Sequence, residues 1–138
     1  MAISTKVCNS YKRECLEGTH ASGDTYKIAL YTSSATLDES TTAYSATNEA
    51  SGTGYSAGGK TLTGFAATLD GNTAILDFGD PTWTGASFTA RVALIYNSSK
   101  SNKAVAVFDF GGDITSSGGN FTIPFPAAAA ATGLIRLA

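Results

Sequence analysis

The recurrence of an apolar residue at every second position from Phe88 to Tyr96 constrains the fold of this chain more than any other feature. A period of two is typical of an extended strand with one buried face. Further runs of this kind, bounded by turn residues, cover 25–32, 60–69, 73–78, 103–110, 121–125 and 133–137. Seven or eight short strands at this spacing predict a mainly β protein, either an antiparallel β-sandwich or a partly closed barrel.

Turn residues separate these runs. Asp70-Gly71-Asn72 stands between two of them and indicates a β-hairpin. The Gly-rich stretches 111–113 and 116–120 are interpreted as turns, and Pro124 and Pro126 are typical of an edge strand over 121–125. The strands are expected to supply these core side chains: Phe88, Val92, Leu94, Val105, Val107, Phe121, Ile123 and Phe125.

One segment has helical periodicity instead. Apolar residues near the N-terminus recur at spacings of three and four, which predicts a helix over 4–17. Ser4 is the expected N-cap, and Gly18 is the expected C-terminal stop. The apolar stripe must cover either the chain's own sheet or a neighbouring subunit. Val7 and Tyr11, which lie on it, are therefore candidate interface residues.

A long polar segment over 33–59 follows the first strand and is rich in Ser, Thr, Ala and Gly. A loop of this length in a compact domain is usually functional, so we predict an arm that contacts neighbouring subunits. Tyr44 and Tyr55 are large side chains among small polar ones, and they are the candidate anchors of that contact. A meander of short edge strands is the alternative interpretation.

The amino-acid composition limits the classes of partner that are expected. The 138 residues are assigned to one domain, and only 14% of them are charged, while Thr, Ser and Gly number 19, 15 and 15. The net charge is −2 and no basic run occurs, so nucleic acid is not an expected partner.

Neither a membrane span nor an export signal is predicted. The longest apolar run, 127–131, falls far short of the roughly 20 residues that cross a bilayer. The N-terminus lacks the apolar centre of a signal peptide, so we expect synthesis in a cytoplasm.

Two cysteines and one histidine offer few metal ligands. Cys8 and Cys15 are seven residues apart in the predicted helix, or about 10.5 Å along its axis, beyond the roughly 7 Å limit for a disulfide. Both thiols are therefore expected to be free and packed. His20 falls in a Gly/Ser-rich turn, where we expect an exposed side chain. A structural zinc site takes four such ligands, so no metal or cofactor is predicted.

Four aspartates near turns raise two further possibilities. Asp109 and Asp113 flank two glycines and could bind calcium, although ordinary turn carboxylates are the favoured interpretation. Any pair of carboxylates among Asp77, Asp80, Asp109 and Asp113 could hydrolyse glycosides. Few aromatic residues cluster near them to bind a sugar. We predict that the chain is not an enzyme.

Residues 54–61 match the phosphate-loop pattern G-x-x-x-x-G-K-[ST] letter for letter. Such a loop works where a buried strand precedes it and a helix N-terminus follows it. Here residues 46–53 are polar and Gly-rich, and residues 62–69 have strand character. We therefore predict neither nucleotide binding nor nucleotide hydrolysis.

Several stretches form a combination that extends over nearly the whole chain. They are 24–32, 51–59, 80–84, 88–91, 93–97, 121–123 and 135–136, together with the N-terminal segment. The combination resembles a family of small virion proteins of tailed bacteriophages. This resemblance implies a structural component of a phage particle, with no catalytic residues to carry over.

The resemblance also sets the expected partners. A capsid decoration (cement) protein that stabilises the head through subunit contacts is the first expectation. A tail, baseplate or fibre-associated structural or receptor-binding protein is the second. The expected partners are further copies of the chain, with a trimer favoured, and other virion proteins such as the major capsid protein. The expected location is the virion, after synthesis in the host cytoplasm. A carbohydrate-binding module, which would expose an aromatic platform, is a distant alternative.

Overall fold

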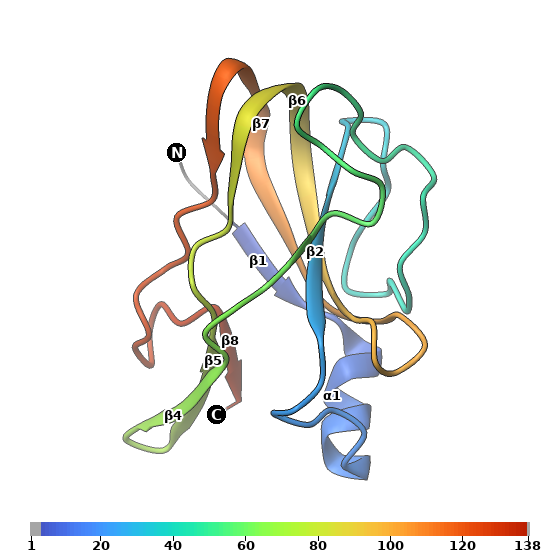
Figure 1. The fold of residues 1–138 in the computed structure, drawn as a ribbon. Coiled ribbons are helices and arrows are strands. Elements are labelled where there is room, and N and C mark those ends of the chain that lie inside the picture. Colours follow the sequence, from blue (N-terminus) through green and yellow to red (C-terminus); the bar gives the residue numbers. More distant parts are fainter. Residues whose placement is uncertain (1–3, 138) are drawn as a thin grey trace.

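The computed structural model describes residues 4–137, which form two antiparallel sheets and one short helix (Figure 1). The elements are β1 (Ser4–Val7), α1 (Asn9–Glu17), β2 (Tyr26–Tyr31), β3 (Lys60–Thr61), β4 (Ala66–Asp70), β5 (Thr73–Asp77), β6 (Thr82–Asn97), β7 (Lys103–Thr122) and β8 (Ile135–Leu137). The predicted mainly β fold is confirmed. Because neither sheet closes on itself, the arrangement is consistent with a sandwich rather than a barrel.

The larger sheet has the strand order β1-β7-β6-β2-β3. Its centre is the long hairpin of β6 and β7, which curls over at the top of Figure 1. The register of this hairpin shifts at several points, and such bulges bend paired strands. In the half of the hairpin that lies away from its turn, the centroid of the Phe121 ring is 5.0 Å from that of Phe88 and 6.0 Å from that of Trp83.

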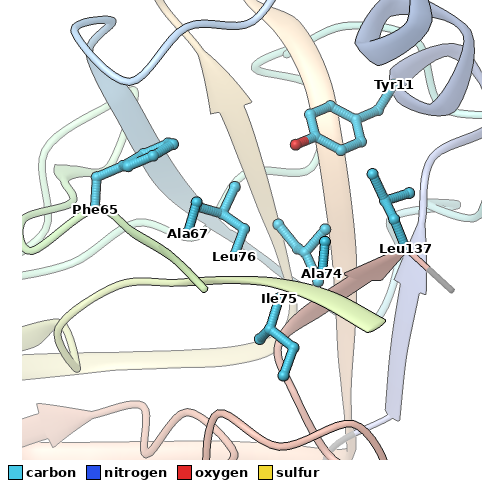
Figure 2. Close-up of a pocket in the computed structure, with 8 residues that line it drawn as sticks. Tyr11, Phe65, Ala67, Ala74, Ile75, Leu76 and Leu137 are labelled. Carbon is cyan, nitrogen blue, oxygen red and sulfur yellow. The ribbon is translucent and has the colours of Figure 1, made fainter. Parts of the chain in front are cut away.

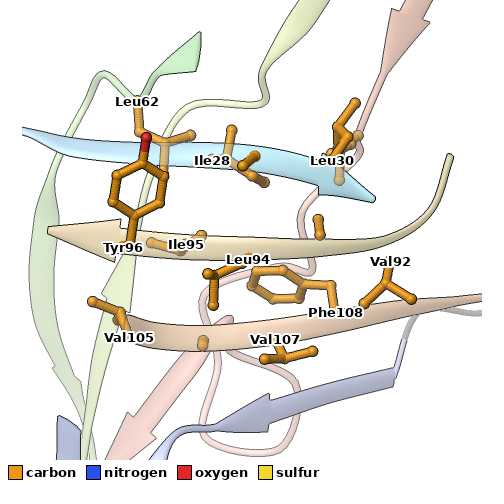
Figure 3. Close-up of a cluster of buried hydrophobic side chains, with 14 of the residues drawn as sticks. Ile28, Leu30, Leu62, Val92, Leu94, Ile95, Tyr96, Val105, Val107 and Phe108 are labelled. Carbon is orange, nitrogen blue, oxygen red and sulfur yellow. The ribbon is translucent and has the colours of Figure 1, made fainter. Parts of the chain in front are cut away.

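The core lies along β2, β6 and β7 (Figure 3). Buried and exposed residues alternate from Ala86 to Ala90, as the sequence predicts, but every residue from Val92 to Asn97 is buried. This half of β6 is therefore covered on both faces. All the predicted core residues are buried, except that Phe125 is only partly buried against the cluster.

The smaller sheet has the order β4-β5-β8, so that β4 and β8 are its edges. The predicted hairpin is confirmed: β4 and β5 are joined by Gly71 and Asn72, with Gly71 at φ 59°. A glycine at the first position of a two-residue loop supplies the positive φ that this turn requires. Figure 1 shows β4 projecting away from the rest of the chain, on the opposite side from α1.

The first half of the predicted helix is wrong, because residues 4–7 form β1 and α1 begins at Asn9. β1 pairs with residues 106–109 of β7. Pairing along a sheet edge outweighs a weak helical preference in a segment that contains β-branched Thr5 and Val7.

Only the C-terminal end of α1 agrees with the sequence prediction. Cys8, not Ser4, is the N-cap residue, and its side chain makes no capping bond. Gly18 ends the helix in the left-handed conformation, as predicted, at φ 75°. No helix within residues 4–137 has the length and apolarity to cross a membrane.

The Gly-rich stretches interpreted as turns lie inside β7, so that prediction is wrong. Ala90 pairs with Ile114 and Val92 pairs with Asp109, which leaves residues 110–113 as a bulge opposite one residue of β6. Glycine serves here to bend a paired strand rather than to end it. The predicted strand over 121–125 is not separate either, because β7 continues to Thr122.

Residues 33–59, the arm, contain no strand and lie along β2 in Figure 1. Isolated bridges tie the arm to its surroundings: Tyr31 to Glu49, Ala43 to Lys103 and Thr53 to Ser87. The segment is a long loop laid over the sheet, not the meander of edge strands considered as the alternative.

Candidate interaction surface

The register of the smaller sheet places apolar side chains together on one of its faces. Directly paired residues of antiparallel strands point to the same side, and the pairs are Ala67↔Leu76, Leu76↔Ile135, Leu69↔Ala74 and Ala74↔Leu137. We call the six residues Ala67, Leu69, Ala74, Leu76, Ile135 and Leu137 the apolar sheet face. Figure 2 shows Ala74, Leu76 and Leu137 directed toward Tyr11, whereas Ile75 points the other way.

The inner part of the apolar sheet face belongs to the core. Tyr11 of α1 and Phe65 line a cavity of about 140 Å³, whose remaining walls come from β4, β5 and β8. The Phe65 ring packs 5.5 Å from Tyr26, centroid to centroid. Leu76 and Ile135 are only 8% and 2% exposed beneath this cover.

The outer part of the apolar sheet face is open to solvent. Leu69 is 76% exposed and Leu137 is 43% exposed. Complete burial of a leucine side chain contributes about 1.5–3 kcal/mol of favourable free energy. Two solvent-exposed leucines on one apolar face would therefore be stabilised substantially if a partner covered them. Leu16 of α1 is 92% exposed but does not belong to this face. An exposed apolar area of this kind is typical of a site where another macromolecule binds.

The edge strands next to this face differ in charge. Three of the four outermost strands carry a cation: Lys6 in β1, Lys60 in β3 and Arg136 in β8. Such residues discourage an edge from pairing with another chain. β4 has neither a basic residue nor proline, and all five of its residues are exposed. Its one charge is Asp70 at the turn, whose Oδ2 accepts a hydrogen bond from the Ala130 N–H (2.6 Å).

A second cluster, centred on Glu49, fastens the arm to the larger sheet. Glu49 Oε1 accepts hydrogen bonds from the Tyr55 hydroxyl (2.6 Å) and the Gly58 N–H (2.8 Å). Its Oε2 accepts one from the Tyr44 hydroxyl (2.7 Å). The Tyr55 oxygen in turn accepts a bond from the Leu30 N–H of β2 (2.9 Å). One carboxylate thus joins three points of the arm and, through Tyr55, the sheet.

The rings of the two arm tyrosines pack inward. Tyr44 stacks on Tyr96 at 4.7 Å between centroids, and Tyr55 lies edge-on to Phe88 at 5.4 Å. Burial, followed by the hydrogen bond to Glu49, raises the pKa of Tyr44 to about 12 and also raises the pKa of Tyr55. Both phenols therefore hold their protons in the folded chain and donate them to Glu49.

The structure brings together only two of the four residues predicted for an interface, Tyr44 and Tyr55, which share the Glu49 carboxylate. Tyr11 is 5% exposed and borders the apolar sheet face. Val7 is partly buried in β1, and Tyr44 and Tyr55 are arm residues whose rings pack inward against the core. An interface role for these residues stays a prediction, while the structure gives Tyr44 and Tyr55 an internal role in holding the arm.

His20 is buried, so the expectation of an exposed turn histidine is wrong. Its side chain is 3% exposed, and Nε2–H donates to Glu14 Oε1 (2.9 Å). Its Nδ1 accepts a bond from the Asn97 amide (3.0 Å), which also donates to Asp24 (2.8 Å). Because an amide nitrogen can only donate, these bonds fix the neutral tautomer. The buried Glu14 and Asn97 side chains need partners, and His20 supplies one to each.

This histidine network extends to the turn between β6 and β7. Lys100 Nζ lies 2.9 Å from Asp24, and Lys103 Nζ lies 3.6 Å from Glu14. The bonds from Lys100 and then Asn97 lower the pKa of Asp24 to about 2. Both ring nitrogens of His20 are engaged by other side chains, which leaves neither to activate a nucleophile. The network links α1 to the sheet.

Two of the four candidate metal and glycosidase aspartates, Asp80 and Asp109, make ordinary local contacts. Asp109 accepts a bond from the Gly111 N–H (2.8 Å) and pairs with Arg91 (3.3 Å), and Asp80 accepts a backbone N–H from the segment after β7 (2.9 Å). The other two, Asp77 and Asp113, lie in β5 and β7. Among the described residues, no three His, Cys, Asp or Glu side chains are grouped so that they could hold a metal ion.

The segment that matches the phosphate-loop pattern, 54–61, leads into the strand β3 rather than into a helix. Its Gly58 N–H already donates to Glu49, and a Cβ at Gly59 would meet the Ile28 carbonyl oxygen at 1.8 Å. The glycines therefore allow the arm to lie directly on β2, which explains the match to the pattern in structural terms.

Both cysteines are free: Cys8 is buried and Cys15 is partly buried. Burial raises the pKa of Cys8 to about 12. A thiol that stays protonated is a poor nucleophile and a poor metal ligand, so Cys8 acts as a packed apolar group.

Comparison of the chain with models of protein families, with characterised proteins and with solved structures yields no match. The apolar sheet face is therefore interpreted from its own chemistry. Sequence reasoning missed it, although a signal exists: Ala67, Leu69, Ala74 and Leu76 stand symmetrically about the hairpin turn. Once a two-residue turn is assumed, these four residues must share a face.

Proposed function

We propose that this protein is a structural component of a tailed-bacteriophage particle and that it binds its neighbours through the apolar sheet face. The observation that carries the proposal is the exposed outer part of that face, where Leu69 and Leu137 lie in solvent. Apart from the Tyr11 hydroxyl, the side chains that line the adjoining cavity are hydrocarbon. Such a surface fits an apolar protein partner better than a small polar substrate.

The sequence resemblance to small virion proteins supports the choice of particle. A capsid decoration protein is favoured, and a tail, baseplate or fibre-associated protein is the alternative. A charged fraction of 14% and many small residues suit the close packing of subunits in a coat. The partners in this proposal are further copies of the chain and the major capsid protein.

The arm provides a second contact in this proposal. Its outward residues are mostly small, polar and exposed, which lets another backbone approach closely. Glu49 and the tyrosines hold the arm against its own sheet, so little conformational entropy would be lost when a neighbour binds it.

The geometry gives less support to a carbohydrate-binding module. Trp83 is 5% exposed and packs against Phe88 and Phe121 instead of forming an open platform. Sugar binding by aromatic stacking needs the face of such a ring to be accessible.

A reconstitution experiment tests the proposed function. Particles assembled without this protein are mixed with the purified chain, with the Leu69→Ser/Leu137→Ser variant, or with the Leu16→Ser variant, and the bound fraction is measured after sedimentation. Leu16→Ser is the matched control, because it removes a more exposed leucine that is not part of the apolar sheet face.

Wild type and Leu16→Ser are expected to bind equally, and the double variant at least about tenfold more weakly, since about 1.4 kcal/mol of lost burial corresponds to a factor of ten. Absence of binding by the wild type to heads and to tails would refute the virion role. Equal binding by all three proteins would refute the role of the apolar sheet face.

A further inference from the structure

The β4 edge is an outermost strand that has no basic residue and adjoins an exposed apolar face. All five β4 residues are exposed, and Leu69 among them is 76% exposed. The opposite edge of the same sheet, β8, carries Arg136, and the two edges of the larger sheet carry lysines. Among the four outermost strands β4 alone lacks a basic residue, which favours β4 as the strand that pairs.

We propose that β4 pairs antiparallel with β4 of a second copy, which joins the two small sheets into one six-stranded sheet of order β8-β5-β4-β4-β5-β8. The inference builds on the proposed role of the apolar sheet face as a contact surface. It adds that the first partner on this surface is an identical chain, related by a two-fold axis. Antiparallel pairing of a strand with itself produces this symmetry by necessity.

The sequence of β4 selects the register of the pairing. Ala67 and Leu69 lie on the apolar sheet face, whereas Ala66, Thr68 and Asp70 lie on the other side. A register centred on Thr68 sets Ala67 opposite Leu69 of the second copy, so that apolar residues meet on one face. A slip by one residue would pair each apolar position with one from the opposite face, which sheet pairing disfavours.

The same register keeps the charges apart. Each Asp70 lies opposite Ala66 at an outer end of the paired strands, and the two-fold axis passes between the two Thr68 residues. No like charges meet across the pair, and a Thr–Thr contact is among the favourable cross-strand pairs. All five residues of β4 find a partner, more than in any shifted register.

The dimer would enlarge the surface available to the rest of the particle. The apolar sheet faces of the two copies lie on the same side of the joined sheet and meet at Leu69, each of which packs against Ala67 of the second copy. The assembly unit is then a dimer, not the trimer that the sequence analysis favours.

A charge-pairing experiment at Thr68 tests the inference. Thr68 is exposed, so its substitution leaves the core intact. Analytical ultracentrifugation of the full chain is expected to give twice the mass of one chain at high concentration. Thr68→Lys and Thr68→Glu, each alone, should sediment as monomers, because like charges then face each other across the two-fold axis. An equimolar mixture of the two variants should restore the dimer.

Thr42→Lys is the matched control, since it makes the same change at an exposed position in the arm and should leave the dimer unaffected. The rescue in the mixture also shows that both variants are folded. A monomeric or trimeric wild type, or a dimer that persists in Thr68→Lys, would overturn the inference. If the wild type is monomeric but binds particles, the proposed function is supported and only the inference is refuted. If the wild type is a dimer that binds no particle, only the inference is supported.

Discussion

Two acidic side chains, Glu14 and Glu49, hold separate segments of the chain together through their hydrogen bonds. Glu14 is 3% exposed and, through His20, joins α1 to Asn97 at the end of β6. Glu49 binds the hydroxyls of Tyr44 and Tyr55 within the arm. The sequence could not predict either group, because an isolated Glu or His has the same local pattern whether its partner is water or a residue that lies 77 positions away.

Removal of the histidine should be costly. His20→Ala would take one hydrogen-bond partner from each of the buried Glu14 and Asn97 side chains and leave Glu14 with only the more distant Lys103. A buried polar group that loses its partner costs about 1–3 kcal/mol. We expect the free energy of unfolding in urea to fall by about 2–3 kcal/mol. Glu17→Ala, which breaks the exposed ion pair with Arg13, should change it by less than about 0.5 kcal/mol. Equal effects of the two substitutions would show that the His20 network contributes nothing special to stability.

Alkaline pH should destabilise the fold through its tyrosines. Burial raises the pKa of Tyr26 and of Tyr44 from 10.0 to about 12. The folded state therefore holds these protons more tightly than the unfolded state, so their contribution is complete below pH 10 and is lost as the pH rises toward 12. The free energy of unfolding should decline over this window, and less so in Tyr44→Phe. A value that stays constant up to pH 12 would contradict the burial of these phenols.

At the scale of elements, local patterns predict the strands better than their ends. The alternation in β6 and the hairpin turn at Gly71 can be predicted from the sequence, because each depends on residues that are neighbours in the chain. The strand β1 was not, since its pairing with residues 106–109 of β7 is a long-range contact that overrides local helical spacing. The glycines of β7 favour turns when they are considered alone, and only the pairing with β6 shows that residues 110–113 form a bulge inside a strand.

Two glycines with similar φ angles distinguish the effect of backbone conformation from that of a close contact. Gly18 has φ 75° and open space where a Cβ would stand, whereas Gly59 has φ 80° and the Ile28 carbonyl oxygen at 1.8 Å from that position. Gly18→Ala should cost about 1–2 kcal/mol, the price of a left-handed residue. Gly59→Ala should cost more than about 3 kcal/mol, because the arm must lift from β2. Thermal denaturation of both variants measures these losses. Similar losses of stability in the two variants would contradict the close approach of arm and sheet.

At the scale of the whole molecule, the apolar sheet face exists only because three strands from distant parts of the chain meet. Ala67 and Leu76 are joined by the hairpin, but Ile135 arrives from the C-terminal end. Alternation within single strands was visible in the sequence, while the side of the sheet that stays uncovered depends on where α1 and Phe65 pack. A contact surface of this kind therefore has to be found in the folded chain.

Electron cryomicroscopy of the parent particle tests the central claim most directly. The account predicts density for this β fold on the particle, at the head surface in the favoured case, with Leu69 and Leu137 covered by a neighbouring subunit. The Ser- and Thr-rich arm should lie at a second contact. A particle without this density, or one in which the apolar sheet face of every copy points into solvent, would contradict the account.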